Sequence, residues 1–119
     1  MPSGASAAQR EAERLASLTF FLDHQIGRYQ VAHALRAAGA AVEVHLDHFA
    51  GDMPDVDWIP KVAAKNWVLI TKDQNIRRNA QELGELLVRC LPGMTRRAAG
   101  RPGPLLFTIS RGGTFTKLI

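Results

Sequence analysis

Residues 67–73, Trp-Val-Leu-Ile-Thr-Lys-Asp, constrain the fold more than any other stretch of the chain. Residues 67–70 are apolar at every position, which is typical of a strand buried on both faces of a parallel sheet that helices cover. Asp73 then follows the carboxyl end of this strand. Open α/β sheets bind ligands at that edge, because the strands end there in a crevice between diverging loops.

Residues 18–22 repeat the pattern, since they are apolar apart from Thr19 and are followed directly by Asp23. A carboxylate at the end of a buried strand is costly without a partner. Two such strands bring two carboxylates to one edge, where they repel each other unless a cation neutralises them. Mg²⁺ or Mn²⁺, which prefer oxygen ligands, is the expected cation.

The segments between these strands predict two helical crossovers. Residues 28–39 carry apolar side chains at three- and four-residue spacing and end at Gly39, which predicts an amphipathic helix. Residues 40–46 alternate and predict a strand, which completes a right-handed βαβ unit. A second helix is expected from its N-cap, Asp55, to a stop at Asn66. The fold class is therefore α/β, with a central, mainly parallel sheet flanked by helices.

The C-terminal part predicts a helix over residues 74–91, closed by Pro92 and Gly93, and a short basic helix over 94–99. Residues 105–110 and 114–118 flank Arg-Gly-Gly, which predicts a β-hairpin. The first 16 residues, small and polar, predict a flexible or helical arm. We thus expect an arm over 1–16 and one domain over 17–119, with the hairpin starting at about 105.

A third carboxylate for the edge comes from the helix that precedes residue 67. Asp55 and Asp57 both qualify, and acids in a first helical turn also interact favourably with the helix dipole, so the choice stays open. A metal ion held by such acids polarises a phosphate and lowers the pKa of a bound water. Lys72, Arg77 and Arg78 follow in sequence and are candidate contacts to a phosphate backbone.

The formal net charge of +4 is unevenly distributed, with acids dominating residues 23–57 and arginines dominating from 77 onward. This split fits a polyanion held on a basic surface beside an acidic, metal-binding cleft, although a solvated basic helix face gives the same charges.

The remaining metal-ligating residue types favour structural roles. A zinc cluster around His45, Asp47 and His48 lacks further ligands at a structural zinc spacing, so His24, His33, His45 and His48 are interpreted as solvated or hydrogen-bonded. The single cysteine, Cys90, is predicted to be a buried structural thiol.

No apolar run approaches the roughly 20 residues that span a bilayer. The N-terminus also lacks the pattern of a secretory signal. We therefore expect a cytoplasmic protein with no membrane partner.

Five segments together resemble the PIN-like domains, and most closely the VapC-like toxins of toxin-antitoxin pairs. The similarity extends from residue 18 to about residue 83, and the combination is more specific than any one piece. The segments are FFLD at 20–23, HLDH at 45–48, PDVDWIP at 54–60, VLITKD at 68–73 and IRRN at 76–79.

The resemblance implies a ribonuclease dependent on Mg²⁺ or Mn²⁺, with a parallel sheet between helices. Asp23 and Asp73 match metal-ligand positions, and both Asp55 and Asp57 match the acidic positions of the helix before the central strand. The implied partners are an RNA substrate and a cognate antitoxin that blocks the cleft. Such toxins commonly pair, and no pattern decides whether this chain forms a homodimer.

Beyond residue 83 the chain departs from the family pattern. The family continues into another parallel strand, and residues 84–92 contain no candidate for it, so the chain is either a shortened relative or supplies this strand differently. The first alternative to a nuclease is therefore a catalytically inactive PIN-like module that binds RNA or a protein partner. A phospho-receiver domain is the second, but the adjacent acidic pair that it needs is absent near Asp23.

Overall fold

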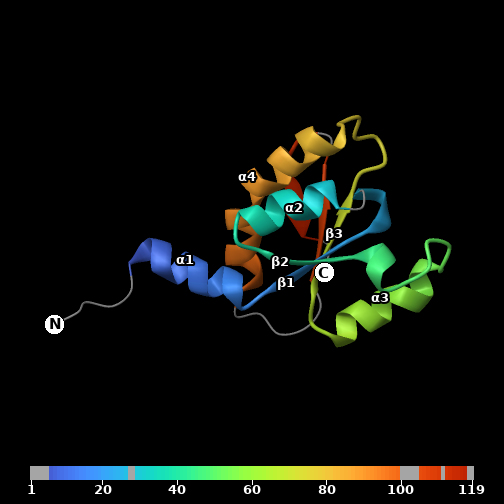
Figure 1. Cartoon of the computed structure of the whole chain (residues 1–119), viewed down its shortest axis with the longest axis horizontal. Helices are drawn as coiled ribbons and strands as arrows, with labels where there is room; N and C mark the ends of the chain where they lie inside the picture. Colours follow the sequence, from blue (N-terminus) through green and yellow to red (C-terminus); the bar gives the residue numbers. More distant parts are fainter. Residues whose placement is uncertain (1–5, 27–28, 100–104, 111, 118–119) are drawn as a thin grey trace.

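The computed structural model describes residues 6–26, 29–99, 105–110 and 112–117. They form a five-stranded sheet in the order β2-β1-β3-β4-β5, with helices on both faces (Figure 1). The elements are α1 (Ala7–Ala16), β1 (Thr19–Leu22), the 3₁₀ turn η1 (His24–Ile26), α2 (Gln30–Ala37), β2 (Ala41–Val44), the 3₁₀ turn η2 (His45–Asp47), α3 (Asp55–Ala64), β3 (Val68–Lys72), α4 (Ala80–Ala98), β4 (Leu105–Ile109) and β5 (Phe115–Lys117).

Two hydrophobic cores hold the layers together. The larger core lies between the sheet and the helices α2 and α4, and Phe20 and Leu22 of β1 point into it. The smaller core lies under α3, where Phe21 meets Trp58 and Leu69. Alternate side chains of β1 thus enter opposite cores, as expected of a strand buried on both faces. The predicted α/β architecture is confirmed.

Helices α2 and α3 end where the sequence predicts. Gly39 follows α2 with a φ of +99°, and Asn66 follows α3 with a φ of 58°. Both angles lie in the left-handed region, which glycine and asparagine adopt most readily. The predicted start of α3 is wrong by one residue: Pro54 is the N-cap, and Asp55 is the first helical residue.

The fourth helix differs from its predicted bounds at both ends. It begins at Ala80 because Asn79 and Glu82 form a capping box, in which Asn79 Oδ1 accepts from the Glu82 N–H at 2.8 Å. It also continues through Pro92 to Ala98, so the predicted stop at Pro92 and the separate basic helix are wrong. The last turns bury Met94, Thr95 and Ala98, and this packing compensates for the backbone hydrogen bond that proline removes.

The C-terminal hairpin is confirmed, because β4 and β5 pair antiparallel with Ile109 opposite Phe115. However, β4 also pairs in parallel with β3, with Val68 opposite Leu105. The sheet therefore contains four parallel strands; the alternative of a relative that lacks the additional strand is wrong, and the alternative that this strand is supplied from another segment is confirmed. This fourth parallel strand is β4, which follows α4. The Arg-Gly-Gly turn predicted its antiparallel pairing with β5 but not its parallel pairing with β3.

The N-terminal arm is helical over its described part. Helix α1 extends away from the sheet and contacts α4 (Figure 1). A capping box between Ser6 and Gln9 starts it, and Glu11 forms a 3.0 Å ion pair with Arg96. Leu15 packs against the larger core. None of the described helices is long and apolar enough to cross a membrane.

Candidate active site

The structure places Asp23 and Asp73 after neighbouring parallel strands. The backbone N–H of Asp23 donates to the Ile70 carbonyl at 3.0 Å, and the N–H of Asp73 donates to the Ile109 carbonyl at 2.8 Å. Each acid thus adds one more hydrogen bond to the parallel ladder and follows it at the carboxyl edge of the sheet. The Asp23 residue is only 9 % exposed, and Asp73 is half-buried.

The loop after β3 fixes the carboxylate of Asp73. Its Oδ1 accepts from the backbone N–H of Asn75 at 2.8 Å. This bond closes an Asx turn, in which an aspartate side chain replaces a backbone acceptor. The backbone carbonyl of Asp73 also accepts from the N–H of Ile76 at 3.1 Å. The chain direction after Asp73 is therefore set by hydrogen bonds to this residue.

Asp55 is the first residue of helix α3, which packs on the smaller core. The indole N–H of Trp58 donates to Asp55 Oδ1 at 3.0 Å, and Trp58 itself is 1 % exposed. Asp57 is exposed and lies two residues further, which is roughly 200° around an α-helix. The two acids therefore point in different directions, and Asp55 is the one that a buried tryptophan orients.

His45 is fully buried, with its ring beside those of Trp58 and His24. Its ring lies 4.8 Å from the Trp58 ring, edge to face, and 5.0 Å from the His24 ring, measured between centroids. Burial is the main cause that lowers the pKa of His45 below its ordinary value, and His24 lowers it further. The negative charges of Asp23 and Asp55 both oppose this lowering of the pKa of His45.

Both ring nitrogens of His45 lack a hydrogen-bond partner among the described residues. The interpretation of this histidine as solvated or hydrogen-bonded is therefore wrong. The reason is local: β2 ends at Val44, and η2 turns His45 into the smaller core, where it meets Phe21 and Phe49. His45 and Trp58 both lie in segments that carry the resemblance to PIN-like domains, but the sequence analysis assigned neither of them a role in the site.

His24 and Asp23 form the second close contact of the site. His24 Nδ1 lies 2.9 Å from Asp23 Oδ1, within the distance of an ion pair. Both atoms are nevertheless buried without a hydrogen bond of acceptable geometry within the described chain. Because hydrogen bonds weaken steeply when the angle is poor, we treat this pair as a close electrostatic contact and not as a formed hydrogen bond.

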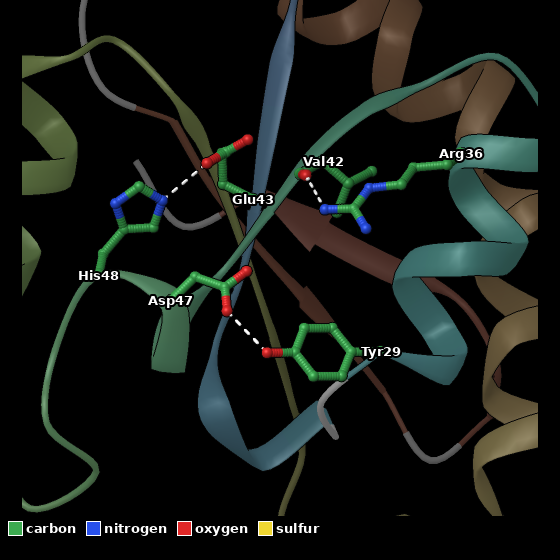
Figure 2. Close-up of polar contacts among 6 residues, drawn as sticks. All are labelled: Tyr29, Arg36, Val42, Glu43, Asp47 and His48. Atoms are coloured by element: carbon green, nitrogen blue, oxygen red, sulfur yellow. Dashed lines mark hydrogen bonds and ion pairs between the residues drawn. The ribbon is translucent and has the colours of Figure 1, made fainter.

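The polar residues around the end of β2 form their own contacts (Figure 2). Tyr29 Oη donates to Asp47 Oδ1 at 2.7 Å, and His48 Nε2 lies 2.7 Å from Glu43 Oε1. The His48 ring also lies 6.0 Å from the Phe21 ring, on the smaller core that His45 enters.

The three candidate phosphate contacts lie in different places. Lys72 is the half-buried last residue of β3, and Arg77 is exposed in the connection to α4. Arg78 is half-buried, and its guanidinium lies beside Gly113 in the hairpin turn. A further polar pair joins the strands near Asp73, since Thr71 Oγ1 lies 2.9 Å from Thr108 Oγ1.

A family model described as "PIN like domain" matches residues 18–95. The chain belongs to the PIN-like domain family. A relative from Mycobacterium tuberculosis (strain ATCC 25618 / H37Rv), named "Putative ribonuclease VapC45", is 30 % identical over 128 aligned positions, which cover 85 % of this chain and 93 % of the relative. No solved structure gave a significant match. The resemblance to PIN-like domains, and to VapC-like proteins among them, is confirmed.

The acidic residues of this PIN-like site have the chemistry of a metal site but not, in the described residues, its geometry. In the part of the chain that the structure describes, no three His, Cys, Asp or Glu side chains converge closely enough to hold a metal ion. The chemistry of the donors nevertheless fits a hard cation, because they are carboxylates. Asp23 Oδ1 fits best, since it is a buried carboxylate oxygen without a hydrogen bond. A cation would neutralise this oxygen and attract the neighbouring acids.

Proposed function

We propose that this PIN-like protein is a metal-dependent endoribonuclease and the toxin of a type II toxin-antitoxin pair. The observation that carries the proposal is the burial of Asp23 and its position, with Asp73, at the carboxyl ends of two neighbouring parallel strands. The similarity to a relative named as a ribonuclease supports RNA as the substrate. A cognate antitoxin and an RNA are the proposed partners, and pairing of two copies is a separate proposal.

In this mechanism Asp23, Asp55 and Asp73 would hold a Mg²⁺ or Mn²⁺ ion. When bound, the ion supplies a water of lowered pKa and polarises the scissile phosphate. The protein's own contribution is orientation: the Trp58 indole fixes Asp55, and the Asn75 N–H fixes Asp73. Asp57 receives no role here, because it points away from the tryptophan-held face of α3.

Cations near Asp73 are proposed to hold the RNA backbone. Lys72 ends β3 directly before Asp73, and Arg77 is exposed four residues after it. Arg78, beside the hairpin turn, extends this positive charge toward β4 and β5. Such contacts to phosphates position the RNA without reading its sequence.

The test is cleavage of a mixed RNA substrate by purified protein in Mn²⁺ or Mg²⁺ and then in EDTA. Asp23→Asn and Asp73→Asn are expected to abolish the metal-dependent products while the far-UV circular dichroism stays unchanged. Asp57→Asn is the matched control and is expected to retain them. Cleavage that survives Asp73→Asn or EDTA contradicts the proposal.

One observation favours a second candidate function. The three candidate acids do not converge on a metal position within the described residues, which is the expected geometry of an inactive PIN-like module that binds RNA or a protein partner. That function predicts RNA binding that falls with salt but ignores Mg²⁺ and Asp73. Binding measured by fluorescence anisotropy with and without EDTA separates the two.

A further inference from the structure

A groove lined by arginines lies between α4 and the C-terminal hairpin, and its volume is about 410 Å³. The exposed residues Arg89, Arg96 and Arg97 line it from α4, and Gly113 and Phe115 line it from the hairpin. No aspartate or glutamate is among the described residues of its wall. The groove therefore concentrates positive charge and attracts anions.

The sequence of α4 brings the hairpin close to the helix at this groove. Residues spaced by four and three share one face of an α-helix, so Arg89, Gly93 and Arg96 lie in a row. Gly93 has no side chain, and a Cβ built there would lie 3.0 Å from the Phe115 ring. The hairpin therefore packs near the helix backbone at a position between the two arginines.

Contacts with neighbouring side chains orient two of the three arginines. The guanidinium carbon of Arg97 lies 5.1 Å from the centre of the Phe115 ring, which is a cation–π distance. Arg96 Nη1 donates to Glu11 Oε1 at 3.0 Å. A guanidinium has five N–H donors, so each contact leaves donors that suit phosphate oxygens. Because Glu11 offsets part of the charge of Arg96, Arg89 and Arg97 are the stronger contacts for an anion.

The groove extends toward the acids of the proposed active site. At its hairpin end, a Cβ built on Gly113 would lie 3.7 Å from the Arg78 guanidinium. The strand before this turn ends at Ile109, whose carbonyl accepts from the Asp73 N–H. The arginines of α4 continue the positive charge over about 12 Å of the helix axis, at about 1.5 Å per residue. This linear arrangement fits an extended polyanion better than one small anion.

We propose that this groove binds the phosphate backbone of RNA beside the proposed cleavage site, with Arg89 and Arg97 as the main phosphate contacts. The inference rests on the proposed function, which makes RNA the expected polyanion. Contacts to phosphates hold RNA in position without reading its bases. The groove therefore raises the affinity for RNA long enough to reach from Asp73 onto α4, and it leaves the affinity for shorter RNA unchanged.

The test compares the double variant Arg89→Gln/Arg97→Gln with the matched double variant Arg14→Gln/Lys61→Gln, which removes the same charge from exposed positions on α1 and α3. Binding of fluorescein-labelled single-stranded RNA in EDTA is measured by anisotropy over a series of salt concentrations. In the groove variant we expect the affinity for long RNA to fall about 2- to 30-fold, as for the loss of two exposed ion pairs. The salt slope should fall by about 1.4, since each contact to a single strand contributes about 0.7.

Two further measurements separate the groove from a general effect of charge or folding. RNA too short to reach α4 should bind the parent and the groove variant equally. Arg89→Lys/Arg97→Lys keeps both charges and should restore the salt slope, although a lysine lacks the planar fork of donors. The melting temperature of each variant in EDTA shows that it is folded.

The inference is overturned if the groove variant binds long RNA as tightly as the control variant does, or if it loses short and long RNA equally. It is also overturned if the groove variant keeps its RNA affinity but loses affinity for a polyglutamate peptide, which would assign the groove to an acidic protein. Cleavage by the parent in Mn²⁺ is measured in parallel. Its absence overturns the proposed nuclease, whereas cleavage by a parent whose groove variant binds RNA normally overturns this inference alone.

Discussion

The buried His45 gives the protein a predictable sensitivity to mild acid. Burial lowers the pKa of this side chain in the folded state. In the unfolded chain the pKa returns to about 6.5. Below pH 6.5 the unfolded chain therefore binds a proton that the folded chain excludes. The free energy of unfolding falls as the pH drops through 6.5, and the fall ends once the pH passes below the folded-state pKa.

The size of this effect follows from proton linkage. For one group that stays neutral in the folded state, stability changes by at most about 1.4 kcal/mol per pH unit. Between pH 7.5 and 5.5, binding of the proton to the unfolded chain limits the loss to about 1.4 kcal/mol in total. A folded-state pKa that lies closer to 6.5 gives a smaller loss with the same sign.

The assay is urea unfolding followed by far-UV circular dichroism at pH 7.5 and 5.5, in EDTA, for the parent and for His45→Phe. Carboxylates and the other histidines contribute in both proteins, so the difference between them isolates His45. We expect the parent to lose up to about 1.4 kcal/mol more than the variant between the two pH values. Equal losses in both proteins would refute the reasoning.

Three further outcomes follow from individual contacts. Trp58→Phe keeps an aromatic ring but removes the hydrogen bond to Asp55, so Mn²⁺ binding by calorimetry should weaken by about 10- to 150-fold, the equivalent of the roughly 1.5–3 kcal/mol of a hydrogen bond to a charged group; unchanged binding would show that Asp55 is not a metal ligand. Gly84→Leu should lower stability by about 1–3 kcal/mol in urea, because a Cβ at this position already lies 3.2 Å from Ala34 Cβ, and parent-like unfolding would show that α2 moves freely. Arg77→Gln should weaken RNA binding and reduce its salt slope by about one in anisotropy titrations, and an unchanged slope would remove Arg77 from the interface.

Local patterns predicted the strands and the positions of two acids. The apolar runs before Asp23 and Asp73 were identified as central strands because they carry apolar side chains for both faces of the sheet. The structure places Asp23 and Asp73 at the same edge of the sheet. Gly39 and Asn66 ended their helices because few other residues adopt a positive φ. Such features depend on near neighbours in sequence, and sequence patterns therefore describe them well.

Features that depend on distant contacts were missed. Pro92 continues α4 because Met94 and Ala98 beyond it are buried in the core, which no local pattern reveals. The parallel pairing of β4 with β3 joins segments separated by a whole helix. His45 sits in an alternating segment that predicted a strand, and only the early end of β2 turns its ring toward Trp58.

The hydrogen bond from the Asp73 N–H to the Ile109 carbonyl has a consequence for the time at which the site is assembled. Synthesis reaches Ile109 only after all of α4, so Asp73 is made well before its backbone anchor. A growing chain that ends within α4 contains every proposed metal ligand but lacks the strand that fixes one of them. Asp73 therefore gains this backbone hydrogen bond only after synthesis has passed α4 and β4 has paired with β3.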